Sequence, residues 1–371
     1  MKIAIITAVY APTSTPRAFR ATELAKEFAR RGHEVTVYNC TSVLGHPPIE
    51  VENVKYINLG IRKVSDGNLK RKIRNHSAFV KIFNLIKRIA FYWTLSTWMI
   101  YLRGIYLYFR PKEKYDLLIS IGLPFTIHWG VSTRIRGNNI AKCYVADYGD
   151  PFSRNNKNIK VAKYFQYIEK MVINKFDYIT IPTEKAIPTY QWLKPIENIK
   201  VIPQGFCFEE VKLQNYRPNN IPTFAYAGIF YPDIRNPQKL FEILLSFDFD
   251  FTFYIYTAQS NTDSYECILP YIDKFQGKLV IKDVIPRLKL IEELSKMDFI
   301  VNMNNTSSNQ VPSKLIDYSL AKRPIYSCSP NEIDIEKLKK FCMGDYQGKE
   351  VIEIEKYNIK IVVDNFCKLI P

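Results

Sequence analysis

The sequence has few of the residues that build compact metal sites. It contains seven cysteines and four histidines in 371 residues, with no Cys-x-x-Cys pair and no histidine at metal-ligand spacing from a cysteine. We therefore expect buried, reduced thiols, a cytoplasmic protein, and no bound metal or cofactor. The opening residues 2–6 are too short for a secretory signal, and the apolar run at residues 89–102 is too short to span a bilayer.

Short-period repeats and low-complexity segments are also absent from the chain. Its length corresponds to two or three domains, and 47% hydrophobic residues supply enough material for two cores. The net charge of +16 is unevenly spread. Between residues 62 and 114, thirteen basic residues are opposed only by Asp66 and Glu113, and ten aromatic residues are mixed among them.

This basic aromatic segment, residues 62–114, must meet something negative or stay solvated. Mixed Trp, Tyr, Lys and Arg side chains suit a helix that lies on an anionic bilayer. The alternative is a pair of core helices with basic faces toward solvent. Nucleic acid is the rival anion, but no recognised nucleic-acid-binding motif accompanies the segment. We expect peripheral association with the inner face of the membrane and no nucleic-acid partner.

Hydrophobic periodicity predicts an α/β fold with two doubly wound sheets. An apolar strand at residues 2–9 precedes apolar residues at helical spacing from Ala18 to Ala29, and residues 34–38 form the next strand. Strand, helix and strand within about forty residues indicate a βαβ unit of a parallel sheet. Later strands are expected at 117–121, 142–146, 178–181, 223–228, 251–256, 279–281 and 299–303, and helices at 237–245 and 285–297.

Residues 311–318, Val-Pro-Ser-Lys-Leu-Ile-Asp-Tyr, give the strongest indication of a ligand site. Pro312 and Ser313 are favourable helix-start residues. Free N–H groups of the first turn, near Ser313, Lys314 and Leu315, would offer a positive helix end to an anion such as a diphosphate. Asp317 lies one turn further on, where it could accept hydrogen bonds from sugar hydroxyls. The alternative is an ordinary capped helix with Asp317 on a solvated face.

Several segments, taken in order, resemble the GT-B glycosyltransferases, and among them the retaining glycosyltransferase family 4. The matching segments are residues 3–12 with 31–37, 178–184, 200–206, 225–228 with Arg235, and 311–318. The resemblance implies two Rossmann-like domains facing a central cleft. It implies an N-terminal acceptor-binding domain at 1–202, a C-terminal donor-binding domain at 203–354, and a last helix at 355–371 packing back on the first domain.

The sequence departs from the family pattern in three places. A glycine pair of the first loop is replaced by a loop with Arg17 and Arg20, either of which could bind an anionic group. The alternative is that both arginines cap a solvated helix start. Of two family carboxylates eight positions apart, Asp317 matches the second and Asn309 replaces the first. Of a basic pair, Arg235 matches the second position, whereas the first is an isoleucine.

The resemblance and the residues together define the expected site. Asp147 and Asp150 follow an apolar strand in a Gly/Pro loop, and Asp150 is the candidate to orient an acceptor hydroxyl; an Asx turn before Pro151 is the alternative. Arg235 and Lys314 would stabilise a leaving diphosphate. The expected donor-binding residues are Gly228, Arg235, Asn309, Pro312, Ser313, Lys314, Leu315 and Asp317, and the acceptor or phosphate loop contributes Arg17, Arg20, Asp147 and Asp150.

The implied activity is transfer of a sugar from a nucleotide diphosphate donor, with UDP favoured over GDP and with retention. The implied acceptor is lipid-linked or an oligosaccharide, in bacterial-type surface polysaccharide assembly. Two alternatives remain open. One is a catalytically inactive nucleotide-sugar-binding subunit, which Asn309 and Ile229 would favour. The other is a sugar-nucleotide epimerase, which the scarcity of histidine disfavours.

Overall fold

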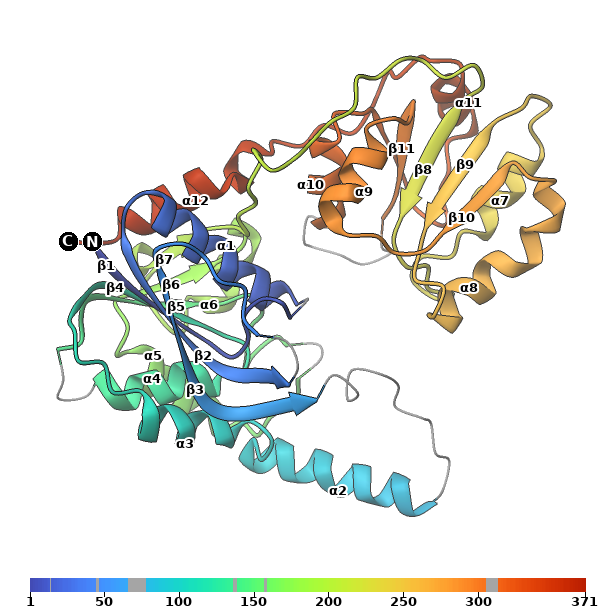
Figure 1. Ribbon diagram of the computed structural model, residues 1–371. Helices are drawn as coiled ribbons and strands as arrows, with labels where there is room; N and C mark the ends of the chain where they lie inside the picture. Colours follow the sequence, from blue (N-terminus) through green and yellow to red (C-terminus); the bar gives the residue numbers. More distant parts are fainter. Residues whose placement is uncertain (14, 45–46, 66–77, 136–138, 157–158, 305–312) are drawn as a thin grey trace. The chain divides into compact units, whose positions relative to one another are not determined.

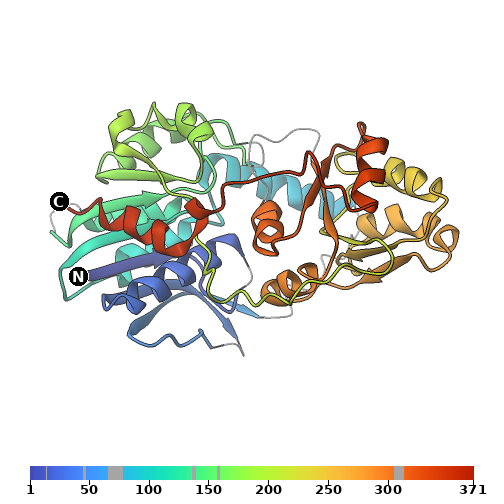
Figure 2. The same cartoon turned by 90° about the horizontal axis from the view of Figure 1, so that it is seen from above.

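The computed structural model divides the chain into two compact units (Figures 1 and 2). It describes residues 1–371 except 14, 45–46, 66–77, 136–138, 157–158 and 305–312. The first unit comprises Met1–Phe206 and Lys356–Pro371, and the second comprises Cys207–Glu355. The sequence analysis placed the corresponding boundaries after residues 202 and 354.

The first unit is built on a parallel sheet with strand order β3-β2-β1-β4-β5-β6-β7. Its interior strand β1 is buried on both faces, with Ile3, Ile5 and Ile6 fully covered, as expected for a sheet with helices on both sides. The described strands are β1 (Lys2–Thr7), β2 (Glu34–Leu44), β3 (Val54–Ser65), β4 (Tyr115–Ile121), β5 (Ala141–Asp147), β6 (Tyr178–Ile181) and β7 (Ile199–Val201).

Helices cover the two faces of this sheet: α1 and α12 lie on one, and α3 and α4 on the other (Figure 1). Helix α1 begins where the sequence provides a cap, because the Thr15 hydroxyl accepts from the Ala18 N–H and Pro16 takes the first helical position. The described helices are α1 (Pro16–Arg30), α2 (Ala78–Thr94), α3 (Met99–Tyr108), α4 (Thr126–Ile135), α5 (Phe165–Ile173), α6 (Ile187–Tyr190) and α12 (Ile359–Cys367), with 3-10 turns η2 (Glu184–Ala186), η3 (Ile196–Asn198) and η6 (Glu355–Tyr357).

The second unit has a parallel sheet of order β10-β9-β8-β11-β12. Aromatic packing holds its centre: the ring of Phe224 stacks on Phe253 at 4.7 Å and on Phe299 at 4.6 Å between centroids. Its strands are β8 (Thr223–Ala227), β9 (Thr252–Tyr256), β10 (Leu279–Lys282), β11 (Phe299–Met303) and β12 (Ile325–Cys328), and its helices are α7 (Gln238–Leu245), α8 (Thr262–Ile268), η4 (Leu269–Tyr271), η5 (Asp273–Phe275), α9 (Arg287–Leu294), α10 (Ser313–Leu320) and α11 (Ile335–Cys342).

The C-terminal helix α12 packs on the first unit. Phe366 is fully buried against Phe28 of α1, with ring centroids 6.5 Å apart. Arg31 at the end of α1 pairs with Asp364 at 2.5 Å. Gly205 permits the close approach of α12, because a Cβ there would lie 2.4 Å from the Cδ1 atom of Ile359. The last helix therefore completes the hydrophobic core beneath α1.

Two expectations from the sequence concern the cysteines and the apolar segments. All seven cysteines are free thiols, four of them buried. Within the described residues, no helix has both the length and the apolar character needed to cross a bilayer.

We predict that Phe366→Ala lowers the free energy of unfolding of the first unit by about 3–5 kcal/mol, because it opens a cavity between α12 and α1. Urea titration followed by circular dichroism measures this loss. Phe19→Ala is the matched control, since Phe19 lies on α1 but is 49% exposed. Equal effects of the two substitutions would show that α12 does not contribute to the core.

Candidate functional site

The carboxyl ends of β8 and β9 and the helix α10 enclose a cavity of about 170 Å³ in the second unit. Parallel α/β sheets bind ligands at this edge. The cavity is lined by residues 227–229 at the end of β8, residues 256–258 at the end of β9, Val284, Ile285 and Leu290 between β10 and α9 and on α9, and Lys314, Asp317 and Tyr318 of α10. The expected donor residues Gly228, Lys314 and Asp317 thus meet around one cavity.

Lys314 lies directly over Gly228. A Cβ atom added to Gly228 would stand 1.5 Å from the Lys314 Nζ atom, and the φ of +146° at this position also favours glycine. The missing side chain therefore makes room for the lysine ammonium at the end of β8. The sequence predicted Gly228 as a donor-binding residue but did not show that its missing side chain leaves space for Lys314.

Lys314, which lines the cavity, shares the Tyr226 hydroxyl with a second cation, Arg235, which is not among the lining residues. Lys314 Nζ and Arg235 Nη1 each lie 3.5 Å from the Tyr226 oxygen, and Arg235 also donates to the Ile229 carbonyl at 3.2 Å. Among the described residues, no carboxylate pairs with Lys314. Burial, and then repulsion from Arg235, lower the pKa of Lys314 to about 7. An anion bound between the two cations would offset both the burial of the Lys314 charge and its repulsion from Arg235.

Asp317 is held by a residue that sequence reasoning missed. Arg287, the first residue of α9, donates from Nε to the Asp317 Oδ1 atom at 2.7 Å, and its Nη2 atom forms an ion pair with the same oxygen at 2.6 Å. Burial raises the pKa of Asp317, although Arg287 opposes the shift. The Asp317 carboxylate therefore reaches the cavity already engaged by one cation. An arginine following Pro286 at a helix start was the available signal.

Of the remaining predicted donor residues, two are described by the structure and two are not. Asn309 and Pro312 lie outside the described residues. The described part of α10 begins at Ser313, as expected for that helix. The Leu315 side chain is buried with those of Ile316 and Leu320, so this face of the helix packs inside the second unit. The Tyr318 hydroxyl, absent from the predicted set, donates to the Ala227 carbonyl at 2.9 Å and seats α10 on the end of β8.

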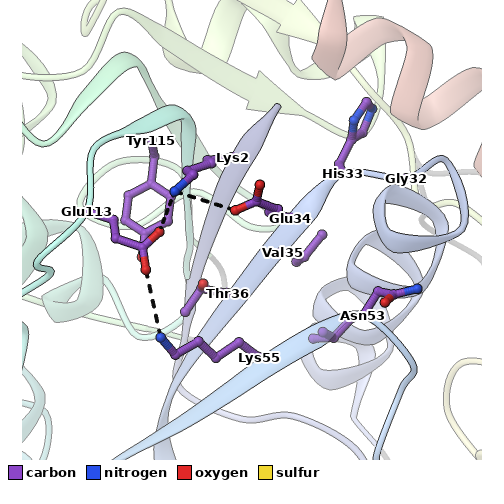
Figure 3. Close-up of a pocket in the computed structure, with 11 residues that line it drawn as sticks. Lys2, Gly32, His33, Glu34, Val35, Thr36, Asn53, Lys55, Glu113 and Tyr115 are labelled. Carbon is purple, nitrogen blue, oxygen red and sulfur yellow. Dashed lines mark hydrogen bonds and ion pairs between the residues drawn. The ribbon is translucent and has the colours of Figure 1, made fainter.

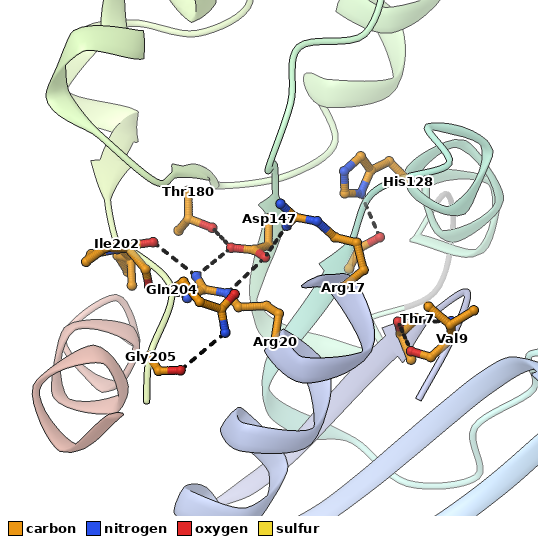
Figure 4. Close-up of polar contacts among 12 residues, drawn as sticks. Thr7, Val9, Arg17, Arg20, His128, Asp147, Thr180, Ile202, Gln204 and Gly205 are labelled. Atoms are coloured by element: carbon orange, nitrogen blue, oxygen red, sulfur yellow. Dashed lines mark hydrogen bonds and ion pairs between the residues drawn. The ribbon is translucent and has the colours of Figure 1, made fainter. Parts of the chain in front are cut away.

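In the first unit, Asp147 and Arg20 form a buried ion pair at the carboxyl end of β5 (Figure 4). Arg20 donates to Asp147 at 2.8 and 3.2 Å, and Thr180 donates to the same carboxylate at 2.7 Å. The Arg20 guanidinium also donates to the Ile202 and Pro203 carbonyls. Arg20, 3% exposed, is therefore used inside the protein and is not positioned to bind an external anion.

Arg17 is the more accessible of the two arginines. Its side chain is 21% exposed, and its Nη1 atom lies 3.7 Å from Asp147. Its guanidinium packs over Gly149, where a Cβ would lie 1.2 Å from Nη2. Burial would raise the pKa of Asp147, but Arg20, Arg17 and Thr180 together hold it below its ordinary value. Asp147 thus positions Arg17 at the edge of the sheet.

Asp150 is exposed in the loop that follows β5. A second buried carboxylate fixes this loop: Glu169 accepts from the Tyr148 hydroxyl at 2.9 Å and from the Ser153 N–H at 3.1 Å. His128 lies nearby, fully buried, with its Nδ1 atom 2.8 Å from the Ser120 hydroxyl. Burial lowers the pKa of His128 to about 3, so the ring stays neutral.

A wider open pocket of about 590 Å³ lies at the opposite, amino-terminal edge of the same sheet (Figure 3). Its charged side chains pair with one another: Lys2 contacts Glu113 at 2.8 Å and Glu34 at 3.5 Å, and Lys55 contacts Glu113 at 3.9 Å. No predicted site residue lines this pocket, and its charges are already balanced.

The sequence contains an Asp-x-Asp pair, Asp248 and Asp250, of the kind that can bind metals. Both residues are exposed and precede β9, at the edge of the sheet opposite the cavity. Asp250 pairs with Lys278 at 2.9 Å. In the described part of the chain, no group of three His, Cys, Asp or Glu side chains could hold a metal ion.

Solved structures with the same arrangement identify the fold. A glycosyltransferase from Rickettsia africae ESF-5 and the lipopolysaccharide outer core galactosyltransferase WaaB each match with a TM-score of 0.58 and 12% identity, over 100% of this chain and 94% and 99% of theirs. Anabaena Alr3699/HepE, solved in complex with UDP, matches with a TM-score of 0.56 and 11% identity over 99% of both chains. The predicted GT-B architecture is confirmed. At these identities the likeness shows the fold alone.

No protein-family model matches the sequence, and no curated protein matches it.

We predict that Asp147→Asn lowers the free energy of unfolding by about 3–5 kcal/mol, because the Arg20 charge remains buried without its partner. Since the folded-state pKa of Asp147 lies below its ordinary value of 3.8, the wild-type contribution is complete above that value and disappears as the pH falls through the folded-state pKa. Urea titrations at pH 7 measure the loss. Glu113→Gln, in an exposed pair, should change little, and an equally small effect of Asp147→Asn would contradict the assignment.

Proposed function

We propose that the protein is a glycosyltransferase that uses a nucleotide diphosphate sugar as donor. The main support is the pair of cations, Lys314 and Arg235, that contacts the Tyr226 hydroxyl. Lys314 of this pair lies over Gly228 at the carboxyl end of β8. Two neighbouring positive groups, one of them in the lining of the cavity, suit the diphosphate of such a donor. The fold supports the same conclusion, because several solved structures that share it are described as glycosyltransferases.

The second unit would bind the donor and the first unit the acceptor. UDP is the favoured nucleotide, and the complexes of Alr3699/HepE with UDP and with UDP-glucose show that this fold accommodates it in that protein. Asp317, oriented by Arg287, would accept hydrogen bonds from sugar hydroxyls of the donor. The helix start at Ser313 would add N–H donors to the diphosphate.

In the proposed reaction the bond between the anomeric carbon and the diphosphate oxygen breaks, and the acceptor oxygen bonds to that carbon. Arg235 and Lys314 neutralise charge that develops on the leaving diphosphate. The acceptor proton passes to an oxygen of the leaving phosphate, so retention needs no strong protein base. Asp150 orients the acceptor hydroxyl, and Arg17 binds an anionic group beside it. No metal or cofactor is assigned a role in this scheme.

The acceptor would be lipid-linked or an oligosaccharide, in the assembly of a bacterial-type surface polysaccharide. The basic aromatic segment, residues 62–114, would bring the enzyme to the anionic inner face of the membrane from the cytoplasm. The charge asymmetry of this segment supports the proposal, since thirteen basic residues are opposed by two acidic ones.

We predict that UDP raises the melting temperature of the protein and that Lys314→Met and Gly228→Ala each weaken UDP binding at least about tenfold. The first removes a cation, and the second displaces it, because a Cβ would occupy the position of Nζ. Lys282→Met, an exposed lysine at the end of β10, is the matched control. UDP binding without glycoside formation from UDP-sugars would favour the inactive binding subunit. Absence of any nucleotide shift would contradict the donor site.

We also predict that UDP binding weakens as the pH rises. The free Lys314 ammonium has a pKa of about 7, and a bound diphosphate raises it, so binding takes up a proton. The dissociation constant should increase about tenfold from pH 7 to pH 8.5. Calorimetry of UDP binding measures this change. Lys314→Met should abolish the pH dependence in that range, and a wild-type constant that stays flat would exclude Lys314 as the titrating group.

A further inference from the structure

Helix α2 presents an apolar stripe to solvent. Ile82, Leu85, Ile86, Ile89 and Trp93 recur at spacings of three and four residues, so they lie on one face of the helix. Each is between 51% and 58% exposed. In Figure 1, α2 reaches out from the helices that cover the sheet. Exposed apolar side chains gathered on one face of a helix in this way mark a contact with another apolar phase.

The charge around this stripe has one sign. Lys81, Lys87 and Arg88 flank it on the same helix, and the sequence contains no acidic residue between Asp66 and Glu113. The stripe also borders an open groove of about 930 Å³, where Lys160 joins Lys87 and Arg88 in the lining. An apolar stripe edged by cations is the pattern of a helix that lies in the interface of an anionic bilayer.

A second copy of the chain is a poorer occupant for the same stripe. Two stripes packed together would bring the cations of both copies close to each other, and α2 contains no carboxylate to compensate them. A bilayer with anionic headgroups supplies both the apolar phase and the opposite charge.

The end of α2 is tied to the segment that follows the acceptor loop. The Ala162 N–H donates to the Tyr92 carbonyl at 3.0 Å, and the Tyr164 hydroxyl donates to the Trp93 carbonyl. Phe152, two residues after Asp150, packs against Trp98 with ring centroids 6.3 Å apart. The helix with the exposed stripe and the loop that carries Asp150 therefore belong to one packed region of the first unit.

We propose that α2 is the membrane-docking element: it lies in the plane of an anionic bilayer with its apolar stripe in the acyl region, and its cations bind lipid phosphates. Docking through α2 would hold the loop that carries Asp150 near the bilayer, where this loop could meet lipid-borne substrates. This inference rests on the proposed function only for the nature of the acceptor. It assigns the membrane contact, proposed above for residues 62–114, to the single helix α2.

The test is sedimentation of the full chain with vesicles of phosphatidylcholine alone and with 30% phosphatidylglycerol. Wild-type protein should bind the anionic vesicles at least tenfold more tightly. The double variant Ile86→Gln/Ile89→Gln should lose at least tenfold in binding, and so should Lys81→Gln/Lys87→Gln. The matched control is Leu269→Gln/Val351→Gln, two exposed apolar residues of the second unit, which should bind as wild type.

Insertion is checked separately with brominated lipids, which quench nearby tryptophan. The protein has four tryptophans, and Trp93→Phe should remove most of the quenching. Equal vesicle binding by the stripe variant and its control, or quenching that survives in Trp93→Phe, would overturn the proposal. So would sedimentation equilibrium that shows a wild-type dimer dissociated by Ile86→Gln/Ile89→Gln.

The UDP-induced shift in melting temperature, measured on the same variants, separates this inference from the proposed function. Both α2 variants should keep the wild-type shift, because the donor cavity belongs to the second unit. Vesicle binding without a UDP shift would refute the transferase proposal and leave the docking helix standing. A UDP shift without vesicle binding would refute the docking helix and leave the transferase proposal standing.

Discussion

The buried ion pair between Asp147 and Arg20 is the contact on which the first unit depends most. It joins the end of β5 to α1, and the same guanidinium caps the Ile202 and Pro203 carbonyls where the chain leaves the sheet. Three segments distant in sequence are thereby fixed at one edge. Because the carboxylate also faces Arg17, the pair that stabilises the fold positions this arginine, which is more exposed than Arg20 on the same helix α1.

The two units handle buried cations differently. In the first, Arg20 is matched by a carboxylate and carbonyls, so its charge is compensated in the folded chain. In the second, Lys314 contacts a tyrosine hydroxyl and lies near another cation, and no carboxylate of the described residues pairs with it. A bound anion, or loss of its proton, would remove this unfavourable charge. This contrast separates a structural charge from one available for binding, and it supports assigning the diphosphate to the second unit.

Much of the fold followed from periodicity, because buried parallel strands such as Phe299–Met303 are continuous apolar runs bounded by breaks. The edge strand β3 was missed, since Lys55, Asn58 and Arg62 interrupt its apolar residues. Within the candidate site, helix-start chemistry located Ser313 and Lys314. Arg287 was missed: its place after Pro286 at a helix start was a signal, but its partner lies thirty residues away in sequence. Nor could helix-start chemistry separate Arg17 from Arg20, because only tertiary packing decides which arginine is enclosed.

Gly228 and Gly149 each leave the space of a missing side chain to a cation of the protein itself. Glycine near a phosphate site is usually explained by close approach of the ligand to the backbone. Here the protein's own Lys314 occupies that space before any ligand arrives. Positions 228 and 314 should therefore co-vary among relatives. A chain with a side chain at the first position would need a shorter residue than lysine at the second, and would have to draw its diphosphate charge from elsewhere.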